Sequence, residues 1–335
     1  MAASLVSQFT NQGDVVYDPF SGSGTVVLEA WAAGNHAIGN DLNPYAALLT
    51  RSKLFPYGTF DAALKDIESV ATQVGAIIQR VDLRRVPQWV RLFFHPDTLR
   101  EVLAWTSILS ERGLSFLLAC LMGILHHQRP GFLSYPSSHT VPYLREKKFP
   151  RRLFPDMYCY RPLRDRLEAK VKRALTRVPQ LDFKFLRESF SQDAAFLNPG
   201  KAVDAIITSP PYMRQLDYGR DNRLRLWFLG VSDWTKLDSL VSLGEAEFIG
   251  LLRRCLIFWK SLLSPTGRCV LVLGDSFSRL YQAPLPTAIA KVATEEVTGY
   301  AVIAKYTEKI PDLRRVRRGL LGNQFESVLV LNRSQ

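Results

Sequence analysis

Four consecutive residues in the second half of the chain, Ser209, Pro210, Pro211 and Tyr212, place a hydroxyl group beside two prolines and an aromatic ring. They come just after an apolar run, residues 205–207, that is typical of a buried strand. The prolines end that strand and stiffen the loop, because proline lacks an amide N–H and has a nearly fixed φ. Ligands of open α/β sheets bind at this carboxyl edge of the strands. A binding loop is therefore predicted, although a purely structural loop end would have the same sequence.

A second group of residues lies near the start of the chain. Gly22 and Gly24 would let backbone N–H groups approach a ligand without interference from a Cβ atom. Asp41 follows Gly24 by 17 positions, at the end of an expected strand, where a carboxylate can bind a ribose diol. Val27 stands where the dinucleotide fingerprint requires glycine, and no lysine follows the turn as it would in a P-loop. A glycine turn alone is equally often structural.

These residues must be positioned by a βαβ unit. The sequence predicts a strand over residues 14–20, a helix over residues 25–34 and a second strand over residues 36–41. A further helix is predicted over residues 43–54, with Asn43 as its cap. A strand, a glycine turn, a helix and a strand that ends in an acid together indicate a nucleotide-binding fold.

Taken together, these motifs resemble those of a known enzyme family. "DPFSGSGT" (residues 18–25) and "GNDLNP" (residues 39–44) resemble motifs I and II of S-adenosylmethionine-dependent methyltransferases. "TSPPY" (residues 208–212) resembles motif IV of the DNA amino-methyltransferases, which modify cytosine N4 or adenine N6, and its leading serine is more typical of the cytosine-N4 group. Residues 213–230 resemble the segment that follows motif IV in bacterial DNA methylases.

The resemblance implies an α/β fold of the class I methyltransferase type, Rossmann-like, with a seven-stranded, mostly parallel sheet. Residues 1–54 and 181–335 would form the catalytic domain, and residues 55–180 a helical and basic insertion that recognises DNA. The remaining elements fit this fold. They are strands over residues 181–190, 203–208 and 268–277, helices over residues 245–267 and 284–299, and a closing pair of strands over residues 301–310 and 326–333.

The resemblance also implies a role for each motif. S-adenosylmethionine would lie along Asp18, Pro19, Phe20, Gly22, Gly24 and Thr25, with its ribose on Asp41 and Leu42 and its adenine near Ser189 or Asp193. In the catalytic loop, made of Ser209, Pro210, Pro211 and Tyr212, the serine side chain and the first proline carbonyl would accept hydrogen bonds from the target amino group. The tyrosine would stack on a base flipped out of the duplex.

Positive charge is concentrated in the expected insertion. The chain carries a net charge of +12, and residues 145–177 contain twelve Lys and Arg against four Asp and Glu, a net +8. A solvated helix face is the alternative, but basic residues interleaved with Tyr and Phe favour contact with a phosphate backbone. A smaller basic cluster lies at residues 312–319. The residues expected to contact DNA are Arg151, Arg152, Arg164, Arg166, Arg314, Arg315, Arg317 and Arg318.

Other features exclude several classes of protein. Four scattered cysteines indicate reduced thiols, and neither they nor the adjacent His126 and His127 have metal-ligand spacing, so we expect no metal. The most apolar segment, residues 114–125, is too short to span a bilayer and is expected to be a buried helix. The start of the chain has no signal-peptide pattern. We therefore expect no membrane partner and a cytoplasmic, nucleoid-associated protein of a prokaryote or phage, either as a homodimer or with a partner subunit.

Two alternatives stay open from the sequence. RNA guanine-N2 methyltransferases have a related motif and the same motif order, but they normally carry an RNA-binding module ahead of the catalytic fold. A non-catalytic nucleic-acid-binding relative is the second alternative, although its motifs would be expected to decay. Thirteen residues precede the first expected strand, and the upstream motif that caps the methionine end of the cofactor is not evident in them.

Overall fold

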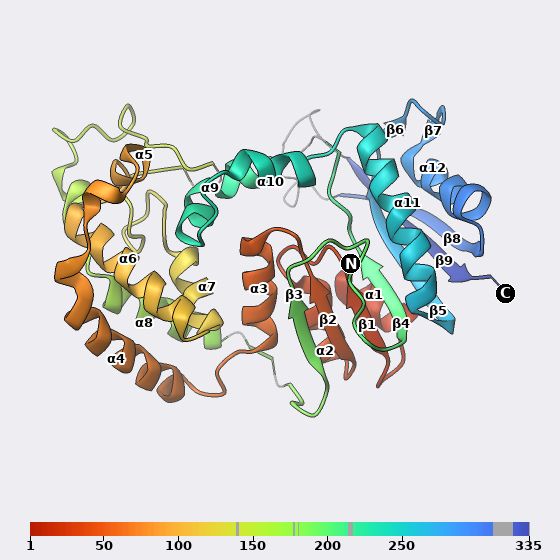
Figure 1. The fold of residues 1–335 in the computed structure, drawn as a ribbon, viewed down its shortest axis with the longest axis horizontal. Helices are drawn as coiled ribbons and strands as arrows, with labels where there is room; N and C mark the ends of the chain where they lie inside the picture. Colours follow the sequence, from red (N-terminus) through yellow and green to blue (C-terminus); the bar gives the residue numbers. More distant parts are fainter. Residues whose placement is uncertain (139–140, 177, 180, 214–216, 311–323, 335) are drawn as a thin grey trace. The chain divides into compact units, whose positions relative to one another are not determined.

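A seven-stranded sheet forms the centre of the part of the chain that carries the predicted motifs (Figure 1). The computed structural model describes residues 1–335 except 139–140, 177, 180, 214–216, 311–323 and 335. The strand order is β3-β2-β1-β4-β5-β9-β8. The strands are β1 Val15–Asp18, β2 His36–Asn40, β3 Arg187–Phe190, β4 Val203–Thr208, β5 Leu263–Gly274, β8 Tyr300–Lys309 and β9 Phe325–Arg333.

The pairing of the strands confirms the predicted α/β fold with a mostly parallel sheet. Strands β1 to β5 pair in parallel, whereas β9 is antiparallel to both β5 and β8. Parallel strands that are buried on both faces read as continuous apolar runs, as β4 does. Tyr17, Ile38 and Ile206 contribute to the core on one face of the sheet. The five parallel strands therefore direct their carboxyl ends, and the predicted loops, to one edge.

Helices cover both faces of this sheet. The helices α1 Ala2–Phe9 and α2 Thr25–Ala32 pack against β4 and against β1 and β2, respectively. The core on the opposite face includes residues of α11 Glu245–Leu262 and α12 Leu285–Lys291. Trp259 of α11 is fully buried there, and its indole N–H donates to the Ala194 carbonyl at 3.0 Å. The small hairpin of β6 Phe277–Ser278 and β7 Ala283–Pro284 precedes α12.

Several predicted boundaries differ from the observed ones. The strand predicted over residues 181–190 is extended only in β3, because Asp182 accepts the Lys184 N–H at 3.0 Å and forms a turn. The helix predicted to end at residue 267 ends at Leu262, shortly before Pro265, which disfavours helical conformation in its neighbour. The helix predicted over residues 284–299 is α12 followed by a π-helical turn, Val292–Val297.

The described chain divides into two units. The first comprises residues 1–50, 180–218 and 236–335, and the second comprises residues 51–179 and 219–235. In this division residues 219–235 group with residues 51–179. They contain most of α9 Tyr218–Phe228, whose Arg225 donates to the Met122 carbonyl at 3.1 Å.

The second unit is mainly helical. Its helices are α4 Phe60–Ile77, α5 Gln88–Arg91, α6 Pro96–Glu111, α7 Ser115–Gly123 and α8 Leu163–Leu175, while α3 Pro44–Leu54 and α10 Trp234–Val241 cross the boundary between the units. Seven residues of α7 are buried, as the sequence predicts. The buried Arg161 donates to the carbonyl groups of Phe132 and Ser134, both at 2.7 Å, and organises the loops of this unit. No helix in the described ranges is long and apolar enough to cross a membrane.

Candidate active site

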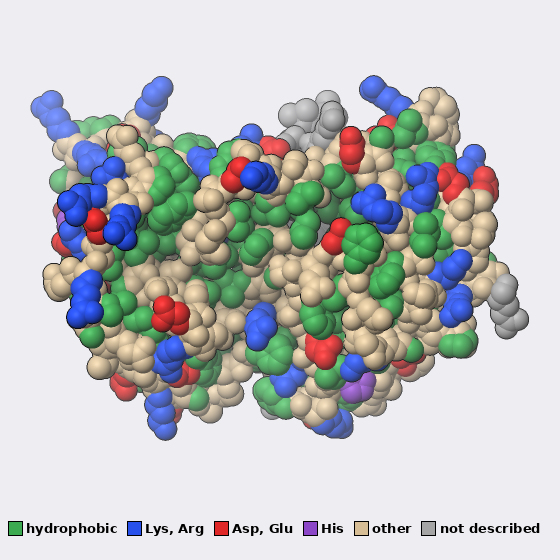
Figure 2. All heavy atoms as spheres, in the orientation of Figure 1, with side chains coloured by type: hydrophobic (Ala, Val, Ile, Leu, Met, Phe, Trp, Pro, Cys, Tyr) green, Lys and Arg blue, Asp and Glu red, His purple; other side chains and the backbone are tan. Residues whose placement is uncertain are grey.

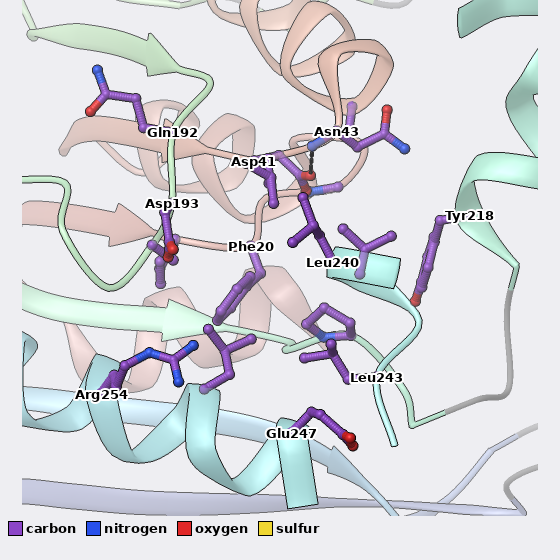
Figure 3. Close-up of a pocket in the computed structure, with 18 of the residues that line it drawn as sticks. Phe20, Asp41, Asn43, Gln192, Asp193, Tyr218, Leu240, Leu243, Glu247 and Arg254 are labelled. Carbon is purple, nitrogen blue, oxygen red and sulfur yellow. Dashed lines mark hydrogen bonds between the residues drawn. The ribbon is translucent and has the colours of Figure 1, made fainter. Parts of the chain in front are cut away.

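A cavity of about 590 Å³ lies within the first unit, at the carboxyl edge of the parallel strands (Figure 3). Phe20, Leu240 and Leu243 point into it, with Tyr218 on one side and Asp193 on another. Eight of the predicted site residues line this cavity, namely Pro19, Phe20, Gly22, Asp41, Leu42, Asp193, Ser209 and Pro211. The predicted residues Asp18, Gly24, Thr25, Ser189, Pro210 and Tyr212 are not part of its wall.

Asp41 joins the glycine turn to the start of α3. Its Oδ2 accepts the Gly22 N–H at 2.8 Å, and its Oδ1 accepts the Asn43 N–H at 2.9 Å. Burial raises the pKa of Asp41 to about 6, against these two hydrogen bonds, which lower it. Each carboxylate oxygen has a second lone pair, so Asp41 can still accept hydrogen bonds from a ligand in the cavity.

The glycine turn requires its glycines for two different reasons. Gly22 has a φ of +51°, and a Cβ atom there would meet nothing within 4 Å. Gly24 has a φ of +73°, and its Cβ atom would lie 2.8 Å from the Thr50 Cα of α3. Gly22 therefore leaves the cavity wall open, whereas Gly24 allows the close packing of α2 on α3.

Asp18 connects the loop that follows β1 (residues 19–24, here called the cofactor loop) with the end of β4, just before the catalytic loop. It is 2% exposed, and its Oδ1 accepts the Thr208 hydroxyl at 2.6 Å and the Phe20 N–H at 3.2 Å. The Phe20 N–H also donates to the Thr208 Oγ1 at 3.2 Å. Burial raises the pKa of Asp18 to about 7. Asp18 thus holds the loop residues after β1 and β4 in place, rather than forming part of the cavity wall.

The loop that follows β3 provides Asp193 but not Ser189. The Asp193 Oδ1 accepts the Ala195 N–H at 2.9 Å, and the residue lines the cavity. The Ser189 hydroxyl instead donates to the Ala47 carbonyl of α3 at 3.4 Å. Asn40, which we did not predict, fixes this loop, because it donates to the Gln192 carbonyl at 3.0 Å and accepts the Gln192 N–H at 3.0 Å.

The catalytic loop divides its residues between the cavity and the sheet. Ser209 and Pro211 line the cavity, whereas Pro210 is buried. The Tyr212 hydroxyl donates to the Glu326 Oε1 at 2.6 Å, so this ring is held by β9. Tyr218, which we did not predict, lines the cavity instead. Burial raises the pKa of Tyr218 to about 12.

Comparison with known proteins supports the reading of these motifs. A family model described as DNA methylase, covering the N6 and N4 methyltransferases, matches residues 1–51. The type II methyltransferase M.BsoBI of Geobacillus stearothermophilus is 26% identical over 262 residues, which are 70% of this chain and 50% of that protein. The type II methyltransferase M.MjaII of Methanocaldococcus jannaschii is 40% identical over 47 residues, which are 14% of this chain and 9% of that protein.

These matches support the resemblance of the chain to the DNA amino-methyltransferase family. The matched segments cover half of the length of M.BsoBI and less than a tenth of the length of M.MjaII. Among solved structures, an S-adenosylmethionine-dependent methyltransferase from Methanosarcina mazei aligns over 98% of this chain and 97% of its own, with a TM-score of 0.40 and 9% identity.

The cavity fits S-adenosylmethionine, the cofactor of this methyltransferase family. Asp41 retains acceptor capacity for ribose hydroxyl groups, and Gly22 leaves the backbone of the turn accessible. Phe20 forms an apolar wall and is itself held edge-to-face against Trp259, at a centroid distance of 6.0 Å. Asp193 lies at the part of the wall where the adenine is expected. Within the described residues, no group of three or more His, Cys, Asp or Glu could hold a metal ion.

The arginines predicted to contact DNA differ in whether their side chains already contact other residues of the chain. The Arg151 guanidinium stacks on Tyr135 and Tyr158, at 5.1 and 4.8 Å from the ring centroids. Arg164 pairs with Glu168 at 2.8 Å, and Arg166 donates to the Pro162 carbonyl at 3.0 Å. Arg152 is exposed. Arg314, Arg315, Arg317 and Arg318 lie outside the described residues.

Proposed function

We propose that this methyltransferase transfers the methyl group of S-adenosylmethionine to an exocyclic amino nitrogen of a DNA base, with cytosine N4 favoured over adenine N6. One observation carries the proposal. Ser209 and Pro211 of the catalytic loop line the same cavity as Asp41 and Gly22 of the cofactor loops. An acceptor for an amino group thus lies beside the place where the family's methyl donor fits.

The catalytic loop has the chemistry that this transfer needs. The lone pair of an exocyclic amino nitrogen is delocalised into the base, so the free amino group is a poor nucleophile. Pro210 is buried and does not line the cavity, so we assign the acceptor role to Ser209 Oγ, which can accept a hydrogen of the amino group and favour a more tetrahedral nitrogen, whose lone pair is then available. When bound, the cofactor supplies an electrophilic methyl group on a sulfonium. No covalent bond between enzyme and base is needed.

A base inside the duplex cannot reach this cavity, so the target base must flip out of the helix. We had expected Tyr212 to stack on that base, but its ring is held by Glu326 and does not line the cavity. Phe20 and Tyr218 are the aromatic side chains in the wall. We therefore assign stacking on the base to Tyr218, since Phe20 lies in the cofactor loop.

The second unit is the part of the chain to which we assign DNA binding. Figure 2 shows Lys and Arg side chains on the face of the molecule that it draws. Residues 145–177 hold a net +8 of the chain's +12. Lys147 and Arg152 of this segment are exposed. Such side chains can neutralise phosphates of a nucleic-acid backbone, and the interleaved aromatic residues can stack on exposed bases. The first unit would then carry the chemistry, and the second the recognition of DNA.

Transfer of labelled methyl groups tests the proposal. The purified protein is incubated with methyl-labelled S-adenosylmethionine and either double-stranded DNA or structured RNA. We expect label in DNA, and a large loss of that label with Ser209→Ala at unchanged DNA affinity. Label found only in RNA would favour an RNA methyltransferase. Cofactor binding without label in either nucleic acid would favour a non-catalytic relative.

A further inference from the structure

One face of α11 forms part of the cavity wall and carries a cation there. The residues of α11 that line the cavity are Ala246, Glu247, Gly250, Leu251 and Arg254. Their spacing of three and four positions is that of a single stripe along a helix. Arg254 is the positively charged member of this stripe, and it stands at the end farther from the start of the helix.

The Arg254 side chain is available to a ligand. It is exposed, and no other described residue forms a hydrogen bond or an ion pair with it. The neighbouring Arg253, by contrast, donates to the Glu296 Oε2 at 2.8 Å. The Arg254 Nη1 lies 3.8 Å from the place where a Cβ atom on Gly250 would be, so the guanidinium lies against a glycine that also lines the cavity. The N–H donors of Arg254 are therefore unused at the cavity wall.

Arg254 lies at the end of the cavity where Asp193 lies. The Trp259 N–H of α11 donates to the Ala194 carbonyl at 3.0 Å, which fixes this part of the helix against the loop that carries Asp193. Figure 3 shows Arg254 and Asp193 on the same side of the cavity. The Asp193 Oδ1 accepts the Ala195 N–H at 2.9 Å, which leaves its Oδ2 able to accept from a ligand. One end of the cavity thus has both a carboxylate acceptor and a guanidinium donor.

A carboxylate and a guanidinium together are complementary to an edge of adenine. The adenine amino group is a donor, and a ring nitrogen that accepts, N1 or N7, flanks it on either side. Guanine has a carbonyl oxygen in place of that amino group, which would put two acceptors against each other at Asp193. The pair can therefore favour adenine and reject guanine.

We propose that Arg254 donates a hydrogen bond to a ring nitrogen of the cofactor's adenine, N1 or N7, and so determines together with Asp193 which purine the cavity accepts. The inference rests on the proposed function only in taking S-adenosylmethionine as the ligand of this cavity. Gly250 contributes by leaving space for the guanidinium one helical turn before Arg254.

Calorimetric titration with S-adenosylhomocysteine in the absence of DNA tests this role. The probe contains the adenosine of the cofactor but has no methyl group to transfer. We expect Arg254→Met to weaken its binding at least about tenfold, the scale of one hydrogen bond to a charged group. Arg253→Met is the matched control, because it removes the same charge from the adjacent position, where the side chain pairs with Glu296. It should bind the probe within twofold of the wild type.

Analogues of the probe in which C–H replaces one ring nitrogen identify the contact. The 1-deaza or the 7-deaza analogue should bind the wild type more weakly, and Arg254→Met should bind that analogue as well as the wild type does. N3 does not flank the amino group, so the loss caused by Arg254→Met should persist with the 3-deaza analogue. Melting temperatures within a few degrees of the wild type establish that the variants are folded.

The possible failures can be told apart. Wild-type affinity of Arg254→Met for S-adenosylhomocysteine would overturn the role of Arg254, and so would a loss that persists with all three analogues. A wild type that shows the expected pattern but labels neither DNA nor RNA would refute the proposed function and support the role of Arg254. A wild type that does not bind the probe would refute both.

Discussion

Asp41 stabilises the loops around the cavity and also lines the cavity itself. Its two carboxylate oxygens already accept backbone N–H groups from Gly22 and Asn43. Only the ionised carboxylate can satisfy both N–H groups and still accept from ribose. The protonation state of Asp41 should therefore control cofactor affinity.

We expect the affinity for S-adenosylmethionine to fall as the pH drops below about 6. Burial raises the pKa of Asp41 to about 6, so the carboxylate is ionised above this pH and becomes a weaker acceptor below it. Asp41→Asn should weaken binding at pH 8 by at least ~1 kcal/mol, the scale of a hydrogen bond to a charged group. Its affinity should also lose most of the pH dependence. Calorimetric titrations between pH 5 and 8 measure both effects, and an Asp41→Asn protein with wild-type affinity throughout would contradict the assignment.

Among the elements, the turn between β1 and α2 gives the clearest test of the local structure. Gly22 and Gly24 both have positive φ, but only the Cβ atom of Gly24→Ala would clash, at 2.8 Å from the Thr50 Cα. We expect Gly22→Ala to lower the free energy of unfolding by about 1 kcal/mol through backbone strain alone. Gly24→Ala should lower it by clearly more, about 2–4 kcal/mol, because α2 must also move away from α3. Urea unfolding of the two variants makes the comparison, and equal losses would refute this account of the turn.

The elements around the motifs could be predicted from local sequence. The strand that ends in Asp18 and the strand before Ser209 are each a short apolar run followed by turn-forming residues. Both signals can be read from a few neighbouring residues. The sheet therefore follows the prediction. The predicted ends of strands and helices were wrong where a side chain bonds to the nearby backbone and forms a turn instead. Asp182 forms such a turn ahead of β3.

The roles of individual side chains were harder to predict, because they depend on contacts between distant residues. Ser189 and Asp193 were equivalent candidates in sequence, and only the contact of Ser189 with α3 separates them. Nothing near Tyr212 in the sequence signals that Glu326 takes its hydroxyl. Tyr218 follows the motif at a distance that carries no pattern. The contact of Tyr212 with Glu326 and the place of Tyr218 in the cavity wall could therefore not be predicted from the sequence.

At the scale of the whole molecule, clustered charge predicts salt-dependent DNA binding. Lys147 and Arg152 are exposed, whereas Arg164 and Arg166 are engaged within the chain. We expect the double variant Lys147→Gln/Arg152→Gln to have a less steep slope of log affinity against log salt. The slope should change by about 1.8, since each phosphate contact contributes ~0.9 to it.

A matched variant tests whether position or total charge matters. Lys65 is exposed on α4 and Arg80 is exposed shortly after it, in the same unit but outside residues 145–177. Lys65→Gln/Arg80→Gln removes the same charge and should leave the slope nearly unchanged. Equal slopes for the two double variants would indicate that residues 145–177 form a solvated surface and do not contact DNA.

The central claim is that this molecule methylates an exocyclic amino group of DNA, and the identity of the product tests it most directly. DNA treated with the protein and S-adenosylmethionine is digested to nucleosides and analysed by mass spectrometry against standards. Ser209 at the head of the catalytic loop leads us to expect N4-methylcytosine, with N6-methyladenine the second choice within the same chemistry. Finding 5-methylcytosine as the product would contradict the account, because methylation of a ring carbon does not use an acceptor for an amino group.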